Sequence, residues 1–198
     1  QVAQASSRAQ IPMMLRRPIH VSPESIGVSQ KDLVDRILSA RSVKDIQLLA
    51  GKLGAVGNDD AIDTLSGLLT DPRRGVPEAM LSAFGDIGTE HAVDVLVEHT
   101  KDDRPSVRTA AISALGSTQS ARAEKLLLEI VGKSGDPAQI AALSALGSLG
   151  TDRAVEALKT AAMSGDTQIA TAAVYALGQA STPASQQALR QLIDAPDA

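Results

Sequence analysis

Apolar residues in this chain recur at the spacing of an α-helix. Between residues 59 and 71, Ala61, Leu65, Leu68 and Leu69 stand four, three and one positions apart, which places them on one side of a helix. The alternation of apolar and polar residues that is typical of a strand is found nowhere in the sequence. The pattern therefore predicts an all-α protein.

The helical pattern repeats with a period of 31 residues. Five glycines mark the period without insertion or deletion: Gly54, Gly85, Gly116, Gly147 and Gly178. Eleven places after each glycine stands a leucine: Leu65, Leu96, Leu127, Leu158 and Leu189. A period of about 20–50 residues indicates a stacked repeat protein, in which each unit packs only against its neighbours. We therefore predict an α-solenoid of stacked helical hairpins.

Each unit is predicted to hold two helices. The first helix runs into the glycine, which we expect to close it in the left-handed conformation. The second helix is expected to begin four places later, at a side chain that accepts a hydrogen bond from an amide of the first turn. These residues are Asn58, Thr89, Ser120, Thr151 and Thr182. Sequences such as Asp71-Pro72 and Asp136-Pro137 break the chain before the next unit.

The register sets the limits of the stack. Val34 and Ile37 match second-helix positions, so residues 29–195 are predicted to form one leading helix and five helical pairs. In the last segment, Pro183–Asp194, Gln186 replaces the apolar residue found at Ile62, Val93 and Val155, which suits a terminal cap.

Residues 1–28 lack a helical period and are interrupted by prolines, so we interpret them as a flexible or extended N-terminal tail. Within this tail, Ile11–Val21 is apolar and basic, which would suit docking as an extended segment. The opening residues Gln1–Gln10 are small and polar, as expected after a removed signal peptide, and they equally suit an excised fragment or a linker. We expect export to the periplasm rather than a cytoplasmic location.

Composition excludes several kinds of chemistry. The chain has no cysteine, so disulfides, thiol catalysis and thiolate metal sites are excluded. The formal net charge is −4, and residues 1–30 are basic while the remainder is acidic. An acidic body whose only aromatic residues are Phe84 and Tyr175 argues against nucleic-acid binding. No apolar run approaches the roughly 18 residues that span a bilayer.

One unit carries a family resemblance. Residues Leu96–Gly116 combine an apolar helix end, an Asp turn, Val-Arg, an Ala-rich helix and Leu-Gly. This pattern resembles a HEAT repeat of the short bacterial type found in phycocyanobilin lyase subunits, and the resemblance covers residues 30–195. It implies a HEAT-like stack whose second helices line a concave surface. Val107-Arg108 is the only full Val-Arg pair, so the ladder of Asp and Arg expected between units is incomplete.

The histidines form no repeated ligand set. Some HEAT-type enzymes bind iron through His-Glu pairs on symmetry-related helices, whereas this chain has Glu90-His91 and Glu98-His99, in reverse order and on one helix. His99 also stands where other units carry a core residue. We therefore expect no catalytic residue, no metal and no cofactor.

Charged residues on the second helices are the remaining candidate site. They lie opposite the leucine stripe, and acidic residues outnumber basic ones. The predicted protein-binding residues are Asp60, Asp63, His91, Asp94, Glu98, Arg122, Lys125, Glu129, Arg153 and Glu156. A charged, solvated surface is the alternative interpretation, since carboxylates in a first turn also favour the helix dipole. Asp63, Asp94 and Glu98 lie beyond the first turn, which favours an acidic groove.

We interpret the chain as a non-catalytic protein–protein interaction module or scaffold that binds a protein or peptide on its concave helical face. The alternatives are an accessory subunit of a chromophore lyase-like or other enzyme complex, and a structural domain of a larger assembly. An acidic face would select a basic partner segment. One candidate is the chain's own Arg16-Arg17 stretch, in cis or from a neighbouring copy, so self-association through the N-terminal tail stays open.

Overall fold

The computed structural model describes residues 29–133 and 135–194, and these residues contain helices and turns but no strand. The tail at residues 1–28 and its Ile11–Val21 segment therefore lie outside the described residues. The α-helices are α1 (Gln30–Ser39), α2 (Val43–Leu53), α3 (Asp59–Leu65), α4 (Val76–Ile87), α5 (Glu90–His99), α6 (Pro105–Leu115), α7 (Ala121–Val131), α8 (Gln139–Leu149), α9 (Asp152–Ala162), α10 (Thr167–Ala180) and α11 (Pro183–Asp194). The 3-10 helix η2 (Ser66–Thr70) continues α3.

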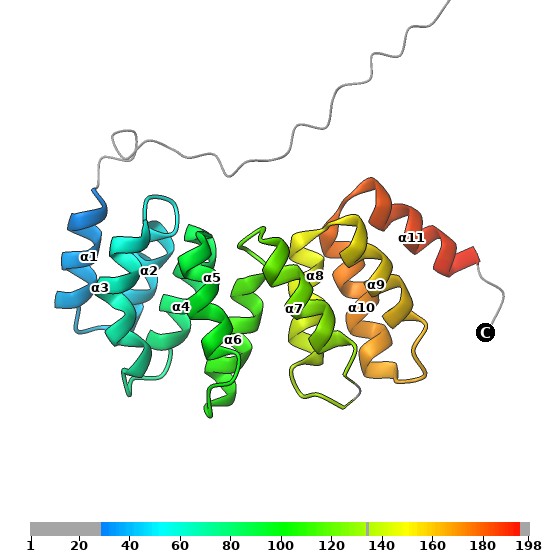
Figure 1. The fold of residues 1–198 in the computed structure, drawn as a ribbon, viewed down its shortest axis with the longest axis horizontal. Helices are drawn as coiled ribbons and strands as arrows, with labels where there is room; N and C mark the ends of the chain where they lie inside the picture. The colour runs from blue at the N-terminus through cyan, green and yellow to red at the C-terminus, as the bar shows by residue number, and fades with distance from the viewer. Residues whose placement is uncertain (1–28, 134, 195–198) are drawn as a thin grey trace, which may run out of the picture.

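The helices stack in chain order along the long axis of the molecule, from α1 at the blue end to α11 at the red end (Figure 1). The first helices of the units, α2, α4, α6, α8 and α10, pack side by side in one layer. The second helices, α3, α5, α7, α9 and α11, form the other layer, which α1 extends beyond α3. This arrangement confirms the predicted all-α solenoid.

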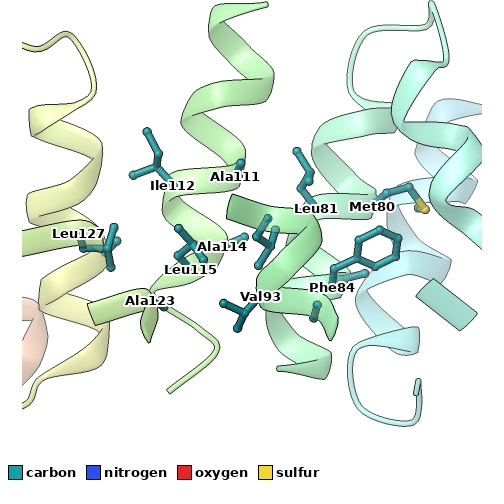
Figure 2. Close-up of a cluster of buried hydrophobic side chains, with 14 of the residues drawn as sticks. Met80, Leu81, Phe84, Val93, Ala111, Ile112, Ala114, Leu115, Ala123 and Leu127 are labelled. Atoms are coloured by element: carbon teal, nitrogen blue, oxygen red, sulfur yellow. The ribbon is translucent and has the colours of Figure 1, made fainter. Parts of the chain in front are cut away.

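The core lies between the two layers and consists of small and medium-sized side chains. Figure 2 shows Met80, Leu81 and Phe84 of α4 near residues of α5, α6 and α7. Four of the five periodic leucines are fully buried: Leu65, Leu96, Leu127 and Leu158. Phe84 is the only aromatic residue buried in the described part of the chain. The core is therefore built from repeated aliphatic contacts.

Side-chain caps begin the second helices, as predicted. The side chains of Asn58, Thr89, Ser120 and Thr151 each accept a hydrogen bond from a first-turn amide, at 3.1–3.3 Å. Thr182 does the same for the amide of Ser185, at 3.1 Å. The capping residue at this position is therefore a reliable start signal in every unit.

The explanation expected for the periodic glycines is wrong. Gly54 and Gly116 are right-handed, with φ of −52° and −65°, and Gly85, Gly147 and Gly178 lie inside helices. The left-handed glycines that end α4 and α8 are Gly88 and Gly150, three residues further on.

Close approach of neighbouring first helices explains three of the periodic glycines. A Cβ atom added at Gly85 would lie 2.6 Å from the carbonyl oxygen of Ala114. At Gly116 and Gly147 the corresponding distances to the carbonyl oxygens of Ala145 and Ala176 are both 2.7 Å. These distances are far inside van der Waals contact, so only glycine lets the next helix approach this closely.

The turns between units share an aspartate that accepts the amide two residues later. This contact recurs at Asp71, Asp102, Asp136 and Asp166. In the turns at Asp71 and Asp102, the residue that donates this amide is an arginine, Arg73 or Arg104. Arg104 donates to Asp102 Oδ1 from Nε at 2.9 Å and to Oδ2 from Nη2 at 2.8 Å, and the same Nη2 donates to the carbonyl of Leu69 at 2.8 Å.

This Asp-x-Arg turn therefore ties one unit to the end of the preceding second helix. Arg73 repeats the arrangement with Asp71 and the carbonyl of Arg41. Hydrogen bonds from Arg104 lower the pKa of Asp102 to about 2. Arg108, of the single Val-Arg pair, donates to the carbonyl of Asp102 at 2.6 Å.

Within the described ranges, none of the helices is both long and apolar enough to cross a membrane.

The Gly–Ala contact predicts opposite effects for two glycine substitutions. Gly147→Ala should destabilise the fold by about 1–3 kcal/mol, because the new methyl group must displace the α10 backbone. Gly51→Ala should stabilise it by about 0.4–1 kcal/mol, because Gly51 lies inside α2 with no neighbouring atom within 4 Å of the added Cβ. Urea unfolding measures both, and equal effects would contradict the close-approach explanation.

The Asp-x-Arg turn predicts a pH-dependent loss of stability for Asp102→Asn. The folded-state pKa of Asp102 is below its ordinary value of 3.8, so its stabilisation is present above that pH and is lost as the pH falls toward about 2. The variant should lose about 1 kcal/mol or less at neutral pH, because Arg104 is half-exposed. The difference from the wild type should vanish near pH 2. Asp136→Asn is the matched control, since Ala138 replaces the arginine there.

Candidate functional site

The structure brings the ten predicted binding residues onto one layer of helices. They lie on α3, α5, α7 and α9, and all are exposed except His91, which is partly buried. Buried residues of these helices, such as Leu65 and Leu96, pack into the core and fix the helices in place. The side chains are therefore presented on rigid elements, and those of successive helices lie beside each other.

Neighbouring second helices are joined by polar contacts at recurring positions, counted from the glycine of each unit. Position nine of one unit meets position six of the next. Asp63 lies 2.9 Å from Nε2 of His91, and Asp94 pairs with Arg122. Position five of one unit likewise contacts position four of the next unit. Thr89 donates a hydrogen bond to Asp59, and Ser120 donates one to Glu90 at 3.4 Å.

The contacts change between α7 and α9. Ala121 stands at position five and Lys125 at position nine, so α7 has no carboxylate at either position. A single residue, Glu124 at position eight, makes both contacts instead. It accepts hydrogen bonds from Thr151 Oγ1 and, at 3.4 Å, from Arg153.

Glu124 is a site residue that the sequence reasoning missed. It is only 7% exposed and occupies the position of Ile62, Val93 and Val155 in other units. A buried carboxylate needs hydrogen-bond donors, and here the next helix supplies them. The signal available in the sequence was a glutamate at a position that is apolar in three of the other four units.

Negative charge is concentrated at α3 and α5. Neither helix contains lysine or arginine, and their exposed acidic residues are Asp59, Asp60, Asp63, Glu90, Asp94 and Glu98. Arg122 of α7 pairs with one of these carboxylates, that of Asp94, so the excess of negative charge is smaller on the side of α5 that adjoins α7. Side chains of Asp63 and Asp94 are nevertheless 71% and 58% exposed. We refer to these six residues as the acidic face.

The histidines have separate surroundings. His91 contacts Asp63, whereas Nδ1 of partly buried His99 lies 2.9 Å from the carbonyl oxygen of Val95 on its own helix. Among the described residues, no group of three or more histidine, aspartate or glutamate side chains is arranged to hold a metal ion.

The repeat register matches a known family. A family model described as HEAT repeats matches residues 31–116, 68–138, 100–170 and 123–198, which together span the stack. The chain therefore belongs to the HEAT repeat proteins. A search of curated proteins finds no match.

The chain is also similar to solved structures, and the likeness to a phycocyanin lyase complex supports the same fold. The complex of CpcE and CpcF of phycocyanin lyase from Nostoc sp. PCC7120 is similar with a TM-score of 0.56 at 20% identity, over 86% of this chain and 72% of that chain. Human deoxyhypusine hydroxylase in complex with glycerol has a TM-score of 0.38 at 18% identity, over 85% and 79%. A designed armadillo repeat protein in complex with the peptide (KR)4 has a TM-score of 0.42 at 16% identity, over 83% and 87%. At 20% identity, the likeness to the lyase complex is one of fold alone.

The recurring contact predicts a stabilising substitution at α7. Lys125→Asp would place a carboxylate at position nine, opposite Arg153 at position six, as Asp94 stands opposite Arg122. We expect a gain of up to about 1 kcal/mol in unfolding free energy, since both side chains are exposed. The gain should disappear in an Arg153→Gln background and at high salt. A gain that persists in that background would show that the charge pair is not its source.

Proposed function

We propose that this chain is a non-catalytic binding module that holds a basic protein or peptide segment on the acidic face of α3 and α5. HEAT repeat stacks in general offer extended surfaces to protein partners, which supports a scaffold role. The proposal rests on one observation. Six exposed carboxylates lie on two adjacent helices that contain neither lysine nor arginine.

Charge gives this surface selectivity more than strength. Opposite charges steer encounter and set the orientation of the partner, while an exposed ion pair contributes only about 0–1 kcal/mol. Asp63 and Asp94 already interact with His91 and Arg122, so an arriving cation has to compete with these contacts or bind beside them. Apolar residues of the partner must therefore add to the affinity.

A segment that combines both kinds of residue exists in the chain itself. Residues 8–21 contain Arg16 and Arg17 between apolar side chains, including Met14 and Leu15. These residues lie outside the described part of the structure, so we propose the segment on its sequence alone. In cis or from a second copy, it has the chemistry that the acidic face would select.

Titration of a peptide of residues 8–21 tests the proposal. The protein is residues 29–198, which retain every residue of the described core, compared with the same body carrying Asp63→Lys and Asp94→Lys. Two reversed charges at up to about 1 kcal/mol each predict binding that is weaker by up to roughly thirtyfold. Affinity should also fall as salt rises above about 0.15 M, where screening acts within roughly 8 Å.

The matched control carries Asp152→Lys on α9 and Asp194→Lys on α11. It has the same net charge as the test variant but leaves the acidic face intact, so it should bind like the unmodified body. Equal binding by all three proteins, unaffected by salt, would show that the acidic face is only a solvated surface.

A further inference from the structure

The chain enters the stack beside the acidic face. Ser29 caps α1, and the next residue, Gln30, donates a hydrogen bond from Nε2 to Oδ1 of Asn58 at 2.9 Å. Asn58 is the residue that caps α3, so the N-terminal ends of α1 and α3 lie side by side at the blue end of the stack (Figure 1). The first two residues of α3 are Asp59 and Asp60, which belong to the acidic face. The segment that precedes Ser29 in the chain therefore starts next to these two carboxylates.

The two carboxylates at this entry point have no cationic partner among the described residues. None of the ion pairs found there involves Asp59 or Asp60. Asp59 accepts a hydrogen bond from Thr89, which is neutral. The neighbouring helix α1 has two basic and two acidic residues, so it adds no net charge. A cation that approaches from this end of the stack therefore meets uncompensated negative charge first.

The residues that precede Ser29 have the complementary charge. Residues 1–28 contain three arginines, including the adjacent Arg16 and Arg17, and one acidic residue. Arg17 stands 12 positions before Ser29, and a flexible chain of that length has an end-to-end distance of roughly 20 Å. Packed helices lie about 8–10 Å apart, which places α3 one such step from α1 and α5 two steps from it. The length of the connection therefore matches the distance to the acidic face.

Tethering favours the chain's own segment over the segment of a second copy. A binding segment whose flexible connection matches the distance to its site has an effective concentration of about 1 mM there. Other copies of the protein at micromolar concentration supply a segment that is roughly a thousandfold more dilute. A contact too weak to join two molecules therefore still forms within one molecule.

The acidic face also offers an apolar contact. Val95 directly follows Asp94 on α5 and lies one turn before Glu98, and its side chain is only partly buried. In the N-terminal segment, Met14 and Leu15 directly precede the two arginines, so apolar and cationic side chains are adjacent there as well. Because exposed ion pairs are individually weak, this pairing of both kinds of side chain strengthens the fit.

We propose that residues 8–21 of this chain bind the acidic face in cis and compete there with the basic segment of a protein partner. This regulation rests on the proposed function of the acidic face, since both concern the same surface. The segment acts as an autoinhibitory strap. It covers the carboxylates in the isolated chain, and a partner has to bind more tightly than the strap in order to displace it.

Binding of a free peptide of residues 8–21 to the full chain tests the proposal. The unmodified chain is compared with the full chain carrying Arg16→Gln and Arg17→Gln, whose strap is weakened. The variant should bind the peptide up to about tenfold more tightly, for a peptide dissociation constant of about 0.1 mM and an effective concentration of about 1 mM. The matched control carries Lys133→Gln and Arg190→Gln, which give the same net charge and leave the strap intact, so it should bind like the unmodified chain.

The absence of cysteine from the chain allows a second test, which separates contact in cis from contact between copies. Thr64 is exposed on α3 and follows Asp63. The full chain carrying Met14→Cys and Thr64→Cys should form a disulfide within one chain on mild oxidation, and denaturing electrophoresis without reductant should show the mass of a single chain. Met14→Cys combined with Gln187→Cys, on exposed α11 at the other end of the stack, should not form this bond.

The outcomes distinguish the strap from the proposed function. Suppose that the chain without the two arginines binds the peptide no more tightly than the unmodified chain, while Asp63→Lys and Asp94→Lys still weaken binding. The strap is then wrong and the proposed function stands. Binding that no longer depends on Asp63 and Asp94 would overturn both. Disulfide-linked dimers of the Met14 and Thr64 variant, in place of a bond within one chain, would show that the contact joins two copies and would overturn the strap.

Discussion

The close approach between successive first helices is the constraint on which the rest of the structure depends. At three junctions a glycine Cα faces the carbonyl oxygen of an alanine, at a distance that excludes any side chain. Dispersion contacts at such short range are numerous, which allows a core with a single buried aromatic residue. The same contact fixes how far each unit advances along the stack. It therefore also sets the spacing of the second helices, whose exposed polar side chains contact one another from unit to unit.

The polar surface follows from that spacing. Because each second helix is displaced from the last by a constant step, position nine of one unit meets position six of the next wherever suitable residues stand there. Asp63 with His91 and Asp94 with Arg122 are two instances of one geometry with different chemistry. Glu124 makes equivalent contacts from a neighbouring position when the usual carboxylates are absent. The backbone geometry thus determines which positions can form polar contacts between units, and the residues at those positions determine whether each contact is charged.

Helix content, register and capping residues were predictable from the sequence, because periodicity and short polar side chains act locally. The role of the periodic glycines was not, since a glycine at a helix end and a glycine at a helix contact look alike until the neighbouring helix is placed. Glu124 was missed for a related reason, because its donors lie 27 and 29 residues away. The charged residues on the second helices were found, but their pairing depends on the distance between helices, which no single unit specifies.

The Gly–Ala contact has a consequence for how such a protein changes in length. It involves main-chain atoms and a methyl group, so it places few demands on the remaining residues of either unit. A whole unit can be gained or lost by duplication or deletion at the DNA level while the junction on each side keeps the same geometry. The outer residues of each unit are then free to diverge. Chain length and surface chemistry can therefore evolve separately within this architecture.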